Sequence, residues 1–311
     1  MKNDLYKAFD DAMIRILKKH GNAMIFMGGF PKAFEPANFM RFFHDRVFNF
    51  GLAEAGLVAS AAGSTVRGKL PFVLGGASFL TGKAWEQIKD MVCVPNFNVK
   101  IIGFGSGLSA GQGGAGMHST SDISLMRNIP NMKVFCPADY YQAIRVFDSI
   151  TEDFGPCYVR LFDGEVENIF DEKYGLKAVD RVREGDEVAI LSHGRLFSEC
   201  LLAVEELERE GKKCGLYNFP IVKPLDKKII LEILGKYKKV FVVEDHGVGG
   251  LYSAVSEILA GMEGAHAVLK KIGIDEKFME SAREEELYKK YGLDKEGILK
   301  EIGGGISTYL S

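Results

Sequence analysis

The 311-residue sequence lacks the features that would assign it to a membrane, a nucleic acid or an oxidising compartment. No apolar run approaches the roughly 20 residues that a membrane-spanning helix needs, and the first residues, MKNDLYKAFDDAM, show no signal-peptide pattern. The formal net charge is only −3, so a surface that binds nucleic acid is not expected. The five cysteines contain no CxxC pair and are widely scattered, which predicts buried, reduced thiols in a cytoplasmic protein.

Common cofactor and catalytic motifs are also missing. There is no Walker loop, HExxH helix, nucleophile elbow or cluster of metal ligands. No Gly-Asp-Gly is followed about 25–30 residues later by Asn, a pair whose oxygens would hold magnesium and a diphosphate. A GxGxxA run spans Gly105 to Ala110, but the next residues are too rich in glycine to open the helix that a dinucleotide site requires. We predict neither a metal site nor a nicotinamide site in this chain.

Glycine is abundant instead. The 36 glycines exceed the roughly 7% of average usage. They cluster at positions 28–29, 75–76, 103–116 and 247–250. Such clusters predict places where the backbone approaches a ligand or another backbone closely.

Short apolar runs alternate with amphipathic helical patterns along the chain, which is typical of parallel sheets covered by helices. The pattern predicts two consecutive open-sheet α/β domains, residues 1–165 and 185–311, joined by a charged, irregular linker at 166–184. In the first domain we expect strands at 23–27, 47–50, 71–74, 98–102, 132–135 and 156–161, and helices at 3–19, after 51, at 78–89 and at 140–150. In the second we expect strands at 187–191, 213–218 and 239–244, helices at 197–210 and 227–237, and a helix-rich tail at 276–301.

Glu54 is the single charge between Arg46 and Arg67, in the most alanine-rich segment of the chain. As a structural residue, a carboxylate in the first turn of a helix complements the helix dipole by about 0.3–1 kcal/mol. As a functional residue, a carboxyl in apolar surroundings has a raised pKa and is suited to share a proton with a ring nitrogen of a ligand. The residues alone leave both interpretations open.

Two further side chains have a structural and a functional interpretation. His118 ends the glycine-rich loop, either as an ordinary loop residue or as a group that contacts a ligand on which the loop closes. Arg160 ends a predicted buried strand, either in an interdomain salt bridge or as a clamp for a phosphate. Because open parallel sheets bind ligands beyond the carboxyl ends of their strands, we expect the site at the ends of the first domain's strands.

Several motifs, taken in order along the chain, resemble transketolase, and more narrowly the C-terminal half of transketolase encoded as a separate chain. They are Phe50-Gly-Leu-Ala-Glu54, Gly114-Ala-Gly-Met-His118, Asp122-Ile-Ser-Leu-Met-Arg-Asn-Ile-Pro-Asn-Met132 and Glu244-Asp-His-Gly-Val-Gly-Gly-Leu251. The resemblance runs from about residue 5 to 295.

This resemblance implies an enzyme that depends on thiamine diphosphate and moves a two-carbon ketol unit from a ketose, such as a sugar phosphate, to an aldose. A separate N-terminal subunit would hold the diphosphate and Mg²⁺, with two copies of each chain in the assembly. Glu54 would bond to the cofactor's aminopyrimidine ring and favour the imino tautomer that starts catalysis. Leu52, Gly76 and Phe79 would lie at that ring.

The same resemblance implies that His118, Arg160 and Ser106 would face the substrate, with Arg160 at its phosphate. Four features depart from the family pattern: Gly114 replaces an aspartate, Ser106 a histidine and Gly76 an aromatic residue, and the acidic residue that usually follows the first strand is absent from Met27-Gly-Gly-Phe30. These departures put the usual sugar specificity in doubt. Two alternatives stay open, a beta subunit of a 2-oxoacid dehydrogenase decarboxylase and a non-catalytic partner or scaffold subunit.

Overall fold

A computed structural model of the chain describes residues 2–29, 37–264 and 266–307. Its first domain is built on a sheet with the strand order β12-β6-β7-β5-β4-β2-β3, in which every strand but β12 runs parallel to its neighbour. These strands are β2 (Ala23–Met27), β3 (Val47–Asn49), β4 (Leu70–Gly76), β5 (Lys100–Phe104), β6 (Lys133–Phe135), β7 (Cys157–Arg160) and β12 (Ile221–Lys223). A short antiparallel ribbon of β1 (Lys2–Asp4) and β8 (Glu165–Glu167) lies beside it.

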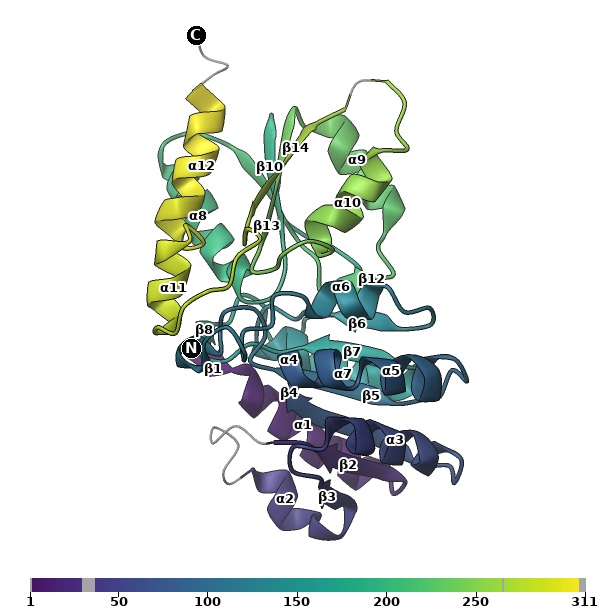
Figure 1. The fold of residues 1–311 in the computed structure, drawn as a ribbon. Helices are drawn as coiled ribbons and strands as arrows, with labels where there is room; N and C mark the ends of the chain where they lie inside the picture. Colours follow the sequence, from purple (N-terminus) through teal and green to yellow (C-terminus); the bar gives the residue numbers. More distant parts are fainter. Residues whose placement is uncertain (1, 30–36, 265, 308–311) are drawn as a thin grey trace.

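Helices cover both faces of this sheet (Figure 1). One face packs against α1 (Leu5–Lys19), α2 (Asn38–Phe42) and α7 (Tyr140–Glu152). The other packs against α3 (Glu54–Thr65), α4 (Ala77–Lys83), α5 (Trp85–Gln87), the π-helical turn η3 (Ile88–Cys93) and α6 (Asp122–Arg127). The expected helix at 78–89 is therefore broken into three consecutive segments.

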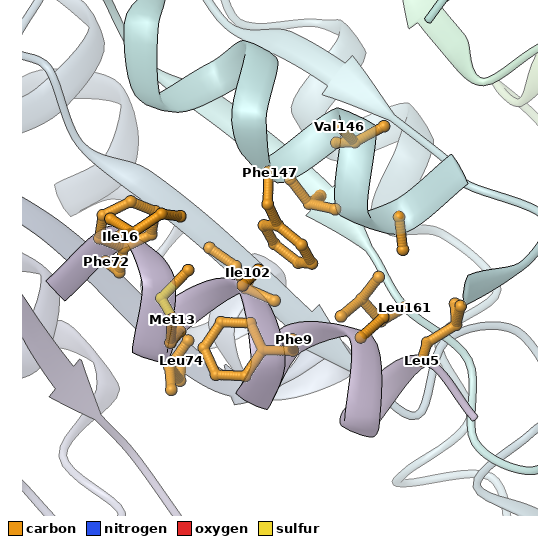
Figure 2. Close-up of a cluster of buried hydrophobic side chains, with 14 of the residues drawn as sticks. Leu5, Phe9, Met13, Ile16, Phe72, Leu74, Ile102, Val146, Phe147 and Leu161 are labelled. Atoms are coloured by element: carbon orange, nitrogen blue, oxygen red, sulfur yellow. The ribbon is translucent and has the colours of Figure 1, made fainter. Parts of the chain in front are cut away.

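The alternation of side chains along β4 shows how one strand supplies both cores. Phe72 and Leu74 point to the α1 side, where Phe9 of α1 and Phe147 of α7 meet edge to face (Figure 2). Val73, between them in sequence, points to the α3 side. Because both faces are buried, the strand reads as a continuous apolar run, which is why the sequence predicts a parallel sheet.

The second domain contains a sheet with the order β14-β13-β10-β11-β9, parallel except for the edge strand β9. Its strands are β9 (Asp180–Arg183), β10 (Val188–Ser192), β11 (Cys214–Asn218), β13 (Lys239–Glu244) and β14 (Val268–Gly273). The helices α8 (Leu196–Arg209), α11 (Glu284–Lys290) and α12 (Lys295–Ser307) cover one face, and α9 (Lys227–Lys236) and α10 (Leu251–Leu259) cover the other. Figure 1 shows this domain stacked above the first.

Two segments that the sequence placed outside a domain contribute a strand to that domain's sheet. Strand β12 lies between β11 and α9 in the chain, yet it pairs antiparallel with β6 at the edge of the first domain's sheet. The segment 166–184, expected to be irregular, contains most of β8 and all of β9, and β9 completes the second sheet. The five cysteines are free and buried, as expected. None of the described helices is both long and apolar enough to cross a membrane.

Candidate active site

Five parallel strands of the first sheet, β7, β5, β4, β2 and β3, end at the same edge, and their following loops surround a cavity of about 300 Å³. This is the edge at which open α/β sheets bind ligands. The lining residues come from the ends of β2, β4, β5 and β7, the turn after β3, the start of α4 and the glycine-rich loop; they are Gly29, Leu52, Gly76, Ser78, Phe79, Phe104, Gly105, Ala110, Met117 and Asp163.

Glu54 is the first residue of α3, two positions after the cavity residue Leu52, and it is only 3% exposed. Apolar side chains follow it on the same helix, with Leu57 and Val58 fully buried. Among the described residues, its carboxylate has one hydrogen-bond partner, the Nζ of Lys83 on α4 at 3.4 Å from Oε2. The other oxygen, Oε1, is therefore available to a ligand as far as the described residues go.

Lys83 links Glu54 to the cavity wall. Its Nζ lies 4.7 Å from the centre of the Phe79 ring, and Phe79 lines the cavity. The close approach of this ring also explains the glycine at position 76. A Cβ at Gly76 would lie 3.1 Å from Cδ2 of Phe79, which is tighter than ordinary van der Waals contact. The absence of an aromatic side chain at position 76 thus leaves room for Phe79.

His118 is buried just beyond the cavity residue Met117. Its Nε2 lies 2.9 Å from the carbonyl oxygen of Gly111. Since a carbonyl only accepts, Nε2 is the donor in this contact. Nδ1 has no partner among the described residues, and the same holds for the fully buried hydroxyl of Ser106 at the start of the same loop. Both polar atoms lie near the cavity and lack a partner among the described residues, which is expected of atoms that bind a ligand. Neither residue lines the cavity itself.

The glycine-rich loop packs against the second domain. Gly107 has φ +62°, and a Cβ there would overlap the carboxylate of Asp245. Gly111 and Gly114 likewise approach residues 281–284 closely. The close approach predicted from the glycine cluster is therefore made, in part, between the two domains.

Arg160 forms an interdomain salt bridge, which is the structural one of the two interpretations that the sequence left open. It is 2% exposed, and its guanidinium donates to Asp122 at 3.0 Å and to Asp245 at 2.8 Å. Burial by itself raises the pKa of Asp245, but Arg160 and other donors outweigh it, so the pKa lies below its ordinary value. Arg160 does not line the cavity. A substrate phosphate would have to compete with Asp245 or Asp122 to reach it, and a contact of Arg160 with a phosphate stays a prediction.

Asp163 is a cavity residue that the sequence reasoning missed. It stands just after β7 and lines the cavity, where it accepts a hydrogen bond from the hydroxyl of Tyr6. Its place after a strand end was the available signal, but its charge made it look like part of the polar segment that follows. Ser78 and Met117 were missed for a simpler reason, because neither residue type indicates a site in a sequence.

No group of three or more His, Cys, Asp or Glu side chains that could hold a metal ion is found among the described residues. The residues that could meet a cofactor are therefore Glu54 with its available oxygen and the apolar wall formed by Leu52, Gly76 and Phe79.

Comparison with known proteins identifies the family. Residues 4–167 match the family model "Transketolase, pyrimidine binding domain", and residues 177–298 match "Transketolase, C-terminal domain". The chain belongs to the transketolase family. It is 36% identical over 307 residues to the "Putative transketolase C-terminal section" of Methanocaldococcus jannaschii, a match that covers 95% of this chain and 94% of the relative. It therefore corresponds to the C-terminal part of a transketolase.

Other transketolase-family relatives point the same way. The chain is 33% identical to one of the subunits of the apulose-4-phosphate transketolase of Actinobacillus succinogenes, with 85% of this chain and 86% of the relative covered. Among solved structures, "Split gene transketolase, inactive beta4 tetramer" superposes with a TM-score of 0.86 at 28% identity and covers 98% of both chains. The transketolase of Campylobacter jejuni, at 17% identity, shares the fold with a TM-score of 0.82, and the match covers 97% of this chain and 47% of that one. The α/β architecture with two domains is thus confirmed.

Proposed function

We propose that this chain is the C-terminal subunit of a two-chain, thiamine diphosphate-dependent transketolase that transfers a two-carbon ketol unit from a ketose donor to an aldose acceptor. The observation that carries the proposal is the environment of Glu54: a buried carboxylate with an available oxygen, at the start of a helix whose preceding turn lines the cavity. The family membership of both domains supports it.

The described residues fit the aminopyrimidine end of this cofactor. Glu54 would hold a ring nitrogen through Oε1 and share a proton there, and its burial strengthens that contact because water does not compete for it. Phe79 and Leu52 would flank the ring with apolar surface. Lys83 would keep the Glu54 carboxylate in place through Oε2. When bound, the cofactor supplies the electron sink for cleavage of the ketose carbon chain.

His118 and Ser106 would act on the substrate, and a partner subunit would hold the other end of the cofactor. His118 and Ser106 hold polar atoms without described partners beside the cavity, and we propose that they contact substrate hydroxyls after small movements of the loop. The diphosphate and Mg²⁺ would be held by an N-terminal partner subunit, with two copies of each chain. The split-gene relative, described as an inactive tetramer of beta chains, supports a requirement for the partner. The cytoplasmic location stays a prediction.

The two alternatives are less well supported. The matches of both domains to transketolase favour this function over a beta subunit of a 2-oxoacid dehydrogenase decarboxylase. The position of Glu54 next to a lined cavity counts against a non-catalytic scaffold, because a buried carboxylate without a ligand costs stability.

The test is to purify the chain with its N-terminal partner and to assay ketol transfer with thiamine diphosphate and Mg²⁺. We expect turnover by the complex and none by this chain alone, and a loss of at least about 100-fold in Glu54→Gln, since a neutral amide cannot share the proton. Glu86→Gln, the same chemical change at an exposed position of α5, is the matched control and should keep full activity. Turnover by this chain alone, or equal activity of Glu54→Gln, would contradict the proposal. Light scattering of the complex checks the two-plus-two assembly.

A further inference from the structure

Among the described residues that line the cavity at the sheet edge, one carries a charge, and that charge is negative. Of the described residues that line it, Asp163 is the ionisable one, and the others are glycines, apolar side chains and Ser78. A site that binds a phosphate uses Arg, Lys or backbone donors directed at the anion. No lysine or arginine lines this cavity within the described part of the chain.

Asp163 is held in place from several sides. Its carboxylate accepts a hydrogen bond from the Tyr6 hydroxyl of α1, and its own backbone N–H donates to Oγ of Ser109 at 3.0 Å. The Gly105 backbone N–H is a further donor to the carboxylate. Burial raises the pKa of Asp163, and these donors offset only part of that shift. The carboxyl is thus a fixed part of the cavity wall.

A second carboxyl lies behind the first. Glu284 of α11 approaches Gly164, the residue next to Asp163, and burial raises the pKa of Glu284 to about 7, with a contribution from the charge of Asp163. The nearby Arg195 is engaged by Glu284 itself at 3.0 Å. The ion pair of Glu284 with Arg195 adds no net charge, so Asp163 is the charged group at this end of the described cavity wall.

Two described cations close to cavity residues, Arg160 and Lys83, are engaged elsewhere. Arg160, three residues before Asp163, is buried between Asp122 and Asp245. Lys83 packs on Phe79 and binds Glu54. Neither lines the cavity.

From this distribution we propose that the end of the substrate that reaches Asp163 is an uncharged, hydroxyl-bearing chain, so that the enzyme acts on sugars without a phosphate there. The inference rests on the proposed ketol transfer and specifies its substrate class. A phosphate would place its negative charges beside a desolvated carboxylate, where repulsion is weakly screened. A sugar hydroxyl, by contrast, donates to that carboxylate in a charge-assisted hydrogen bond.

This specificity differs from what the names of two relatives say of those proteins. One is named for apulose 4-phosphate and another, 34% identical over 82% of this chain, for 6-deoxy-6-sulfo-D-fructose. Both names describe sugars with an anionic end. The acidic cavity of the present chain would exclude such an end.

Binding of unreactive sugar alcohols tests the proposal without requiring turnover. The complex with the partner chain and thiamine diphosphate is titrated by calorimetry with D-arabinitol and with D-arabinitol 5-phosphate. We expect the neutral compound to bind at least tenfold more tightly. Equal or tighter binding of D-arabinitol 5-phosphate would overturn the proposal. The proposal would also be overturned if neither compound bound with a Kd below about 10 mM, which corresponds to a binding free energy of about 2.7 kcal/mol.

Variants assign the effect to one side chain. Asp163→Asn keeps the shape of the side chain and removes its charge, so the preference for the neutral compound should fall by about tenfold. Asp186→Asn makes the same chemical change at an exposed position and should leave the preference unchanged. An unaltered preference in Asp163→Asn would overturn the role of Asp163. Binding of the neutral compound without any ketol transfer would contradict the proposed function and still support this specificity.

Discussion

The Nζ of Lys83 lies 3.4 Å from Oε2 of Glu54, and the two side chains differ greatly in exposure, 53% against 3%. An exposed ammonium at the last residue of α4 thus reaches a buried carboxylate at the first residue of α3. Exposed ion pairs contribute little to stability, but here the carboxylate would otherwise have no described partner.

This pair predicts a measurable coupling. Lys83→Met should lower the free energy of unfolding by about 1 kcal/mol, because it leaves a buried carboxylate unpaired. In the double variant with Glu54→Gln most of that loss should disappear, since the amide carries no charge to satisfy. Urea unfolding of the four proteins measures the coupling. Lys89→Met is the matched control, because Lys89 also stacks on an aromatic ring, Trp85, but pairs with the exposed Asp90. Strictly additive effects would contradict a direct interaction.

The buried contact of Arg160 with Asp245 predicts an acid-sensitive domain interface. Asp245→Asn should cost about 3–5 kcal/mol at pH 7, because removal of one partner leaves the other buried charge uncompensated. The folded-state pKa of Asp245 lies below its ordinary value, so its stabilisation is present above about pH 4 and is lost as the pH falls through the folded pKa. Denaturant unfolding should therefore show a larger difference from the wild type at pH 7 than at pH 3. An equal difference at both pH values would contradict this.

Two glycines of the same loop should respond very differently to alanine. Gly107 has φ +62° and its missing Cβ would overlap Asp245, so Gly107→Ala should destabilise the protein by roughly 2–5 kcal/mol. Gly116 has open space around the Cβ position, and Gly116→Ala should change stability by less than about 0.5 kcal/mol. Thermal unfolding of both variants checks this. Similar melting temperatures would show that the loop is not fixed against the second domain.

The raised pKa of Asp163 predicts a gain in stability when its charge is removed. A carboxyl whose folded-state pKa is raised stabilises the fold only below its ordinary pKa, and this contribution is lost as the pH rises through the folded pKa. Asp163→Asn should therefore raise the melting temperature at pH 8, and this gain should shrink toward pH 4. A stabilisation of about 1 kcal/mol corresponds to a rise of roughly 2–4 °C. A gain that is independent of pH would point to packing instead of charge.

Much of the fold could be predicted from the sequence because the signals are local. Apolar runs such as residues 23–27 and 71–74 are buried on both faces, and the strands appear where these runs lie. The rule that parallel strands present their carboxyl ends at one edge also placed the ligand site at that edge, and the cavity lies there. The resemblance to transketolase, and not this rule, singled out Leu52, Gly76 and Phe79, which line the cavity. The lone charge at Glu54 indicated burial, and Glu54 is buried.

Only the tertiary structure decided the contacts between residues far apart in the chain. The antiparallel pairing of β12 with β6 joins residues from different domains, and no local pattern encodes it. The sequence allowed two roles for Arg160, an interdomain salt bridge and a phosphate contact. The ion pair with Asp245, 85 positions away, is formed only in the tertiary structure. Asp163 became a cavity residue only when the loop after β7 met the loop after β5. The periodicity of the sequence therefore determined the elements and the edge at which a ligand binds, whereas the charges that face that ligand depend on how distant loops pack, which short-range pattern does not specify.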